Sequence, residues 1–190
     1  MTARADAALE TRAALLDAGL EIAEQHGLSG MSVNRVVAAA GVAKGTFYVH
    51  FADRDAFLSA LHERFHGRVG EAVAAARAEL PPGRVRLQRV AEAYFEVCLR
   101  NRGVRALLLE VRNSPGVAGE VAVRNDAFVE LAEPDLRAMG WAEARVAARL
   151  VIAMGAELVM AEMASGARDE VGRGVLWGLL ERLDLGADAA

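Results

Sequence analysis

The feature that most constrains the fold is residues 28–51, where two short helical patterns flank a single glycine. Ser32 precedes the first pattern and is a good N-cap, because its hydroxyl can accept from the unpaired N–H groups of a starting helix. Apolar residues then recur at steps of three and four, and Gly41 can adopt the positive φ that ends a helix. In the second pattern Phe47 and Phe51 stand four residues apart, so one helical face can bury both. The segment therefore predicts two short helices packed about a tight turn.

The polar residues of this helix pair are typical of contact with double-stranded DNA. A helix-turn-helix places its second helix in the major groove. Lysine can donate to guanine or phosphate, and threonine can contact a thymine methyl or a phosphate, whereas tyrosine and histidine suit phosphates. The exposed side of the second helix is expected to carry Lys44, Thr46, Tyr48 and His50. An ordinary helical hairpin with polar residues facing water is the alternative interpretation.

The order of residues across the turn also matches a known pattern. It reads Ala40-Gly41-Val42, the variable pair Ala43-Lys44, Gly45-Thr46-Phe47-Tyr48, His50-Phe51, and then Asp53-Arg54-Asp55 at the start of the next helix. This order resembles the DNA-binding domain of the TetR family of bacterial transcription regulators, and the detailed resemblance covers about residues 8–65. Beyond that segment the resemblance is only to an all-helical second domain.

The resemblance implies roles for individual residues. Asn34 and Lys44 match positions that read bases, and Gly45 matches one that allows close backbone approach. The positions that hold phosphates are matched by Ser32, Thr46, Tyr48, His50 and Arg54. Ala43 stands where the family commonly has serine, so the second helix lacks a side-chain N-cap, a loss of about 1 kcal/mol.

Charge is distributed unevenly along the chain. The formal net charge is −4, from 22 Lys+Arg against 26 Asp+Glu, so a broadly basic surface is excluded. No acidic residue occurs between Glu24 and Asp53, however, which spans the helix pair. A local face without acids is what phosphate contact requires, whatever the net charge.

The rest of the chain predicts an all-α fold. Its 190 residues allow one or two domains, 54% are hydrophobic, and sustained alternation typical of strands is absent. We expect a three-helix helix-turn-helix DNA-binding domain at 1–52 and a larger helical ligand-binding and dimerisation domain at 53–190. The expected helices are about 6–26, the helix pair, 53 to before Pro81, 84–101, 103–112, 117–132, 141–165 and 169–184, with a break at Pro134.

The sequence shows no targeting pattern, and we expect a cytoplasmic protein without a membrane span. No N-terminal stretch joins a basic end to an apolar core, so we expect no signal peptide. The most apolar segment, 150–163, is interrupted by Glu157 and Glu162 and is too short to span a bilayer. A single cysteine, Cys98, excludes an intramolecular disulfide and suits a reducing compartment.

One motif indicates an enzyme and has to be weighed. The run His62-Glu63-Arg64-Phe65-His66 matches the zinc-peptidase pattern, with two histidines at i and i+4 and a glutamate between them. A catalytic zinc needs a third protein ligand, but Ala72 occupies the position where the family of such motifs continues with histidine. We therefore interpret the motif as a chance occurrence on a helix face and predict no catalytic residues, no metal and no cofactor. A zinc-dependent hydrolase stays as the alternative from another class.

The second domain is expected to bind a small molecule and a second copy of the chain. The resemblance implies an inducer pocket, for which we select Phe65, Tyr94, Cys98, Arg112 and Phe128. The last two helices carry more apolar residues than one buried stripe requires, which favours a homodimer through Met154, Leu158, Trp177 and Leu180. We predict a ligand-responsive transcription regulator, a repressor by resemblance, on a palindromic DNA operator. A DNA-binding protein without a small-molecule ligand is the other alternative.

Overall fold

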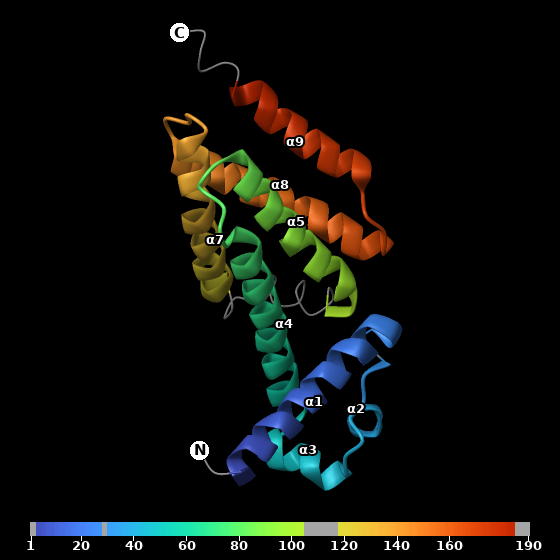
Figure 1. The fold of residues 1–190 in the computed structure, drawn as a ribbon. Helices are drawn as coiled ribbons and strands as arrows, with labels where there is room; N and C mark the ends of the chain where they lie inside the picture. Colours follow the sequence, from blue (N-terminus) through green and yellow to red (C-terminus); the bar gives the residue numbers. More distant parts are fainter. Residues whose placement is uncertain (1–2, 28–29, 105–117, 185–190) are drawn as a thin grey trace. The chain divides into compact units, whose positions relative to one another are not determined.

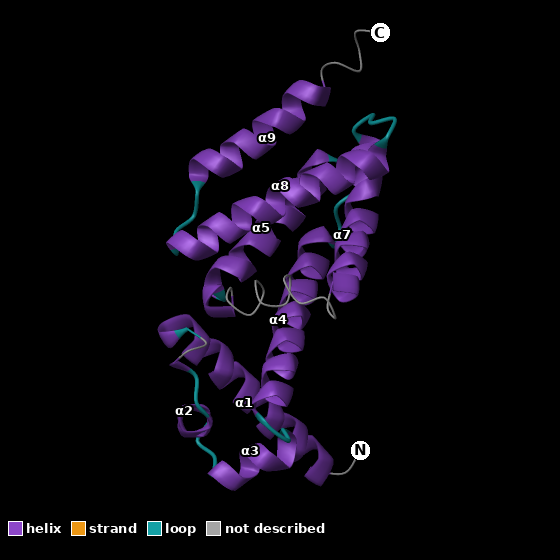
Figure 2. Cartoon of the chain, turned by 180° about the vertical axis from the view of Figure 1, so that it is seen from behind, coloured by secondary structure: helices purple, strands orange, loops and turns teal. Residues whose placement is uncertain are grey.

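The computed structural model of the chain describes residues 3–27, 30–104 and 118–184. Within these ranges every regular element is a helix, as Figures 1 and 2 show, so the predicted all-α fold is confirmed. The chain forms two compact units, one of residues 1–68 with 100–109 and the other of residues 69–99 with 110–190. The first unit thus includes the first part of the fourth helix, and the functional boundary expected after residue 52 stays a prediction. None of the described helices is long and apolar enough to cross a bilayer.

The first unit contains the helix pair. Its elements are α1 (Ala3–His26), α2 (Val33–Ala39), α3 (Lys44–His50), the first part of α4 (Arg54–Arg77) and the 3-10 turn η2 (Arg102–Val104). The expected local signals are present: Ser32 accepts from the Arg35 N–H, and Gly41 has a φ of 68°. Asp53 caps α4, with Oδ1 accepting from the Ala56 N–H at 2.8 Å. Local sequence signals thus define the turn between α2 and α3 and the start of α4.

Three phenylalanine rings hold α3 in place. Phe47 and Phe51 are buried, and their ring centroids lie 5.2 and 5.0 Å from the ring of Phe57 on α4. Such tilted and edge-on pairs add to the stabilisation from area burial alone. One face of the seven-residue α3 is therefore fixed against α4, and the opposite face is left to solvent.

Polar and close-packed contacts join the other elements of this unit. Asp17 on α1 accepts from Arg64 Nε at 3.0 Å and from Arg68 Nη2 at 2.9 Å, both on α4. Burial alone would raise the pKa of Asp17, but the two guanidinium groups lower it below its ordinary value. The η2 turn packs on the end of α1, where Val104 is fully buried and Gly103 lies directly against the backbone of α1.

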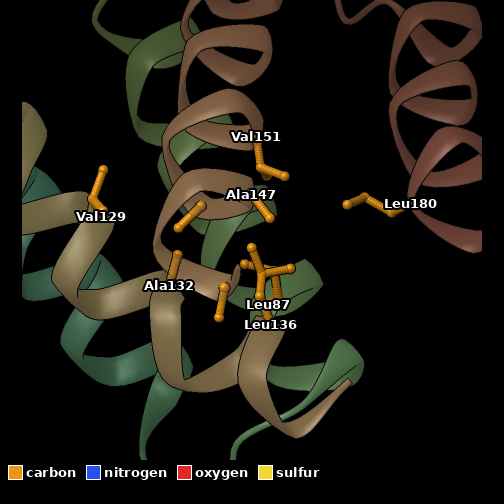
Figure 3. Packing of buried hydrophobic residues seen from close by; sticks show 9 residues of the cluster. Leu87, Val129, Ala132, Leu136, Ala147, Val151 and Leu180 are labelled. Atoms are coloured by element: carbon orange, nitrogen blue, oxygen red, sulfur yellow. The ribbon is translucent and has the colours of Figure 1, made fainter. Parts of the chain in front are cut away.

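The second unit is built from the remaining helices around an apolar core. It contains the second part of α4 with α5 (Arg84–Arg100), α7 (Ala118–Ala138), α8 (Ala144–Ser165) and α9 (Glu170–Asp184). Figure 3 shows buried side chains of this core, which come from α5, α7, α8 and α9. Small residues allow α7 and α8 to approach closely, since Ala132 on α7 and Ala147 and Ala148 on α8 are all in the cluster.

A buried ion-pair network joins α5, α8 and α9. Arg173 on α9 is 2% exposed and donates to both Glu162 carboxylate oxygens at 2.7 Å. The same guanidinium pairs with Glu92 and Glu96 on α5 and lies 5.0 Å from the Phe95 ring centroid. Burial would raise the pKa of Glu162, but hydrogen bonds and the charge of Arg173 lower it. The network matters because removing one partner leaves a buried charge uncompensated.

One expected helix end is wrong. Pro134 lies inside α7, which continues to Ala138. A proline inside a helix removes a backbone hydrogen bond and costs about 3 kcal/mol. The residues that follow offset this cost, because Leu136 is fully buried and Asp135 forms a buried ion pair with Arg86 at 2.7 Å. The expected helix at 103–112 lies outside the described residues from 105 onward.

Candidate nucleic-acid interface

The helix α3, the second of the pair, begins without a side-chain cap. Ala43 is its N-cap residue and makes no side-chain hydrogen bond, as its sequence predicts, while the Thr46 N–H donates to the Ala43 carbonyl at 2.9 Å. The other end is closed by the Phe51 N–H, which donates to the Phe47 carbonyl at 2.9 Å. The helix is therefore positioned by its buried aromatic face rather than by its own termini.

The outer face of α3 carries most of the predicted contact residues. Lys44, Gly45 and Tyr48 are exposed, whereas Thr46 and His50 are half-buried at the edges of this face. Lysine and tyrosine are therefore free to extend outward, and the other two side chains are restricted to the flanks. Val49 is 79% exposed on the same face, although the sequence reasoning gave it no role. The signal that could have found it is its position two residues beyond the buried Phe47.

The preceding helix and the following one supply the other predicted residues. Asn34 on α2 is exposed, and so is Arg54 at the start of α4. Ser32 uses its hydroxyl oxygen as an acceptor at 3.3 Å from the Arg35 nitrogen, which leaves its O–H able to donate elsewhere. Arg35 donates to the Gly30 carbonyl at 2.8 Å, so its guanidinium fixes the loop before α2. All eight predicted DNA-contact residues therefore lie in one compact unit.

The predicted ligand residues are divided between the two units. Tyr94 on α5 and Phe128 on α7 lie together, with ring centroids 5.5 Å apart, and Cys98 is buried on α5. Burial raises the pKa of the Cys98 thiol to about 12, so it is an inert core group. Phe65 is fully buried in the first unit, and Arg112 lies outside the described residues. The ligand set thus stays a prediction, with Tyr94 and Phe128 its only pair in ring contact among the described residues.

An open groove of about 290 Å³ lies between α1 and α4 in the first unit. Its lining combines apolar and charged side chains, among them Leu9, Arg12, Glu63 and Arg64. The Arg12 guanidinium also lies over the Phe51 ring, 5.3 Å from the centroid, so its charge is held near the C-terminal end of α3. None of the four predicted ligand residues that the structure describes, Phe65, Tyr94, Cys98 and Phe128, lines this groove.

The histidines of the zinc-peptidase pattern lie against each other on α4. His62 is 8% exposed and its Nε2 lies 3.1 Å from Nε2 of His66. Glu63 is exposed on another face of the helix. Among the described residues, no group of three or more His, Cys, Asp or Glu side chains is arranged to hold a metal ion. The geometry gives the hydrolase alternative no further support.

The four predicted dimer residues differ in exposure. Met154 on α8 is 36% exposed, while Leu158 and Trp177 are half-buried, and Trp177 Nε1 donates to Glu92 at 3.3 Å. Leu180 is 4% exposed and belongs to the core of its own unit. The apolar residues with the largest exposure on α8 and α9 are instead Val146, Leu150, Val171, Val175 and Leu179.

Comparisons with known proteins agree with this geometry. The family model for bacterial regulatory proteins of the tetR family matches residues 15–61, which cover α2, α3 and the turn between them. The family model thus identifies this segment as similar to the DNA-binding part of tetR-family regulators. The HTH-type transcriptional regulator AcrR of Shigella flexneri is 35% identical over 74 residues, which are 39% of this chain and 34% of that protein. YvdT of Bacillus subtilis (strain 168), an uncharacterized HTH-type transcriptional regulator, is 37% identical over 49 residues, 26% of this chain and 25% of the relative.

Solved structures extend the likeness to the fold of nearly the whole chain. A TetR-like transcriptional regulator from Rhodococcus sp. RHA1 has a TM-score of 0.69 at 23% identity, covering 90% of this chain and 94% of that one. A TetR-family regulator from Pectobacterium atrosepticum has a TM-score of 0.64 at 22% identity, covering 96% and 95%. At such identities the likeness concerns the fold alone. The matched segments span only about a third and a quarter of the curated relatives.

Proposed function

We propose that this chain is a TetR-family DNA-binding transcription regulator that places α3 in the major groove. The observation that carries the proposal is the two-sided construction of α3. Phe47 fixes one side in the aromatic core, and Lys44 and Tyr48 extend from the other, in a segment without a single acidic residue. A rigid helix with donors on its free face is what reading base edges and phosphates requires. The chain acts in the cytoplasm, where its DNA lies, and has no catalytic role.

The contact residues divide into two groups by chemistry. Lys44 and Asn34 read bases, because lysine donates to guanine O6 and N7 and an amide pairs with adenine N6 and N7. Backbone phosphates are held by Ser32, Thr46, Tyr48, His50 and Arg54. Gly45 is exposed and carries no Cβ, so the helix backbone can approach the base edges closely. Phosphate contacts position the helix without carrying sequence information.

Two copies of the chain bind a palindromic operator. Exposed apolar residues recur every four positions along α8 at Val146, Leu150 and Met154, and along α9 at Val171, Val175 and Leu179. Residues four apart share one face of a helix, so each helix presents a continuous apolar stripe. A two-fold dimer through these stripes places its half-sites one DNA turn apart, about 34–36 Å, or a multiple of it. Of the residues selected from the sequence, Met154 belongs to these stripes.

A small molecule regulates DNA binding from the second unit. The contact of Tyr94 with Phe128 makes these rings the first residues to examine for ligand binding. The ligand releases the operator only if it binds the arrangement that cannot hold DNA more tightly than the arrangement that can. Repression is the mode of action that we propose.

Two substitutions on α3 test the division of roles. Preferred duplexes are selected from a random library with the full chain, and affinities are then measured for the selected and a scrambled duplex. Lys44→Ala should weaken the selected duplex by roughly 5- to 150-fold, the equivalent of 1–3 kcal/mol for one base contact, and flatten the preference. Tyr48→Phe should weaken both duplexes equally, and Gln88→Ala, exposed on α5, should change neither. Failure of the parent chain to bind any duplex in dilute buffer would refute the proposal.

A further inference from the structure

Two residues one helical turn apart on the exposed face of α3, Gly45 and Val49, are not explained by any contact within the chain. Val49 is 79% exposed, which makes it the most exposed large apolar residue among those described. Valine is a poor helix former because its branched side chain restricts χ1 in a helix. The chain therefore accepts an unfavourable residue at a site where it gains almost no packing.

Gly45 lies one helical turn before Val49 and is equally unexplained. A Cβ built at Gly45 would meet nothing within 4 Å, so no packing contact requires glycine there. The φ of Gly45 is not positive either, so no backbone conformation requires it. Glycine inside a helix costs up to about 1 kcal/mol relative to alanine. The space beside Gly45 is open, so a group from outside the chain can approach the backbone there.

The two positions together form one recess and one projection. Residues at i and i+4 lie one above the other on the same helical face. At 45 the backbone itself is the surface, and at 49 a short branched side chain projects from it. A partner that approaches the backbone at Gly45 also faces the methyl groups of Val49, one turn further along the same face.

The chemistry of valine limits what it can read. It has no hydrogen-bonding group, so it cannot bind phosphates or the polar edges of bases. The one apolar group that a DNA base presents in the major groove is the C5 methyl of thymine, and apolar side chains read it by contact. The face of Gly45 and Val49 therefore matches a thymine and not the other three bases.

We propose that Val49 is a specificity-determining residue that reads the methyl group of one thymine in each half-site, and that Gly45 permits the approach. The inference rests on the proposed DNA-binding function and adds a base preference to it. It assigns Val49 a task that differs from the hydrogen bonding of Lys44 and from the phosphate contacts of Tyr48.

Removing only the methyl group tests the inference. In a duplex selected with the parent chain, each thymine is replaced in turn by deoxyuridine, which keeps every hydrogen-bonding group. The parent should lose about four-fold in affinity per half-site at one thymine, the equivalent of one buried methyl group, and little at the others. Val49→Ala should show no loss at that thymine, whereas Val49→Thr, which retains one methyl, should keep part of it. Val85→Ala, at a position 63% exposed on α5, should give the parent profile.

The outcomes separate the two proposals. A uracil profile in Val49→Ala that equals the parent profile overturns the role of Val49 and leaves DNA binding intact. A parent chain that selects no duplex overturns the proposed function and this inference with it. Circular dichroism of Val49→Ala and Val49→Thr checks that these surface substitutions leave the helical content unchanged.

Discussion

The contact between Gly103 and α1 makes a sharp prediction about the first unit. A Cβ at residue 103 would lie 1.9 Å from both the carbonyl carbon and oxygen of Ala23 and 2.1 Å from the nitrogen of Glu24. Ordinary van der Waals contact begins near 3.4 Å, so Gly103→Ala requires a separation of about 1.5 Å between η2 and α1. The obstacle is backbone of a continuous helix, which cannot rotate away as a side chain can.

The cost follows from overpacking and lost burial. Overpacking a close contact costs about 1–3 kcal/mol, and the rigid obstacle places this site at the upper end. The neighbouring Val104 is fully buried, and displacing η2 would expose part of it at up to about 1.5–3 kcal/mol. We expect Gly103→Ala to lower the free energy of unfolding by about 3 kcal/mol. For a chain of this size that corresponds to a Tm about 6–12 °C lower.

Differential scanning calorimetry of the parent and two variants measures this difference. Gly70→Ala is the matched control, because the same methyl group on α4 meets nothing within 4 Å. It should raise the free energy of unfolding by up to about 1 kcal/mol, since alanine is the better helix former. The reasoning would be refuted if Gly103→Ala had the Tm of the parent, or if the Tm of both variants shifted in the same direction.

Two further predictions concern the second unit. Arg173 lowers the pKa of Glu162 below its ordinary 4.5, so this pair stabilises the fold fully above that pH, and the contribution is lost as the pH falls through the lowered pKa. In urea unfolding between pH 3 and 7, the free energy of unfolding of Glu162→Gln should therefore fall less steeply with decreasing pH than that of the parent. An unchanged pH dependence would contradict the prediction. Leu150→Glu, at a position 60% exposed on α8, should weaken the proposed dimer at least about 100-fold, because it buries an unpaired carboxylate. Sedimentation velocity measures the loss, with Val85→Glu on α5 as the control, and a dimer that persists in Leu150→Glu would place the interface elsewhere.

Local signals in the sequence predicted the helix pair nearly residue by residue. The Ser32 cap, the positive φ of Gly41 and the burial of Phe47 and Phe51 all depend on neighbours within one or two turns. Interactions of such short range leave a readable pattern, because the same few residues form them in any tertiary context. The division of α3 into a fixed face and a free face was therefore predictable.

Contacts between distant segments were not readable in this way. The helical ending expected at Pro134 failed because burial of Leu136 and the pairing of Asp135 with Arg86, 49 residues away, outweigh the local cost of proline. The exposure of single apolar residues on α8 and α9 was not readable either, since Leu180 belongs to the core whereas Leu150 is 60% exposed. Which apolar residue is buried depends on the partner helix, and the sequence of one helix does not contain it.

What the sequence by itself determined is the all-α class, the turn that joins α2 to α3, and the polar residues that α3 presents. Only the tertiary structure decided that Val49 is exposed on that face, that Gly103 packs directly against the backbone of α1, and that Arg173 forms ion pairs with three carboxylates. The physical reason is range. Capping and periodicity act along the chain, whereas burial, close approach and ion pairing depend on residues that folding alone brings together.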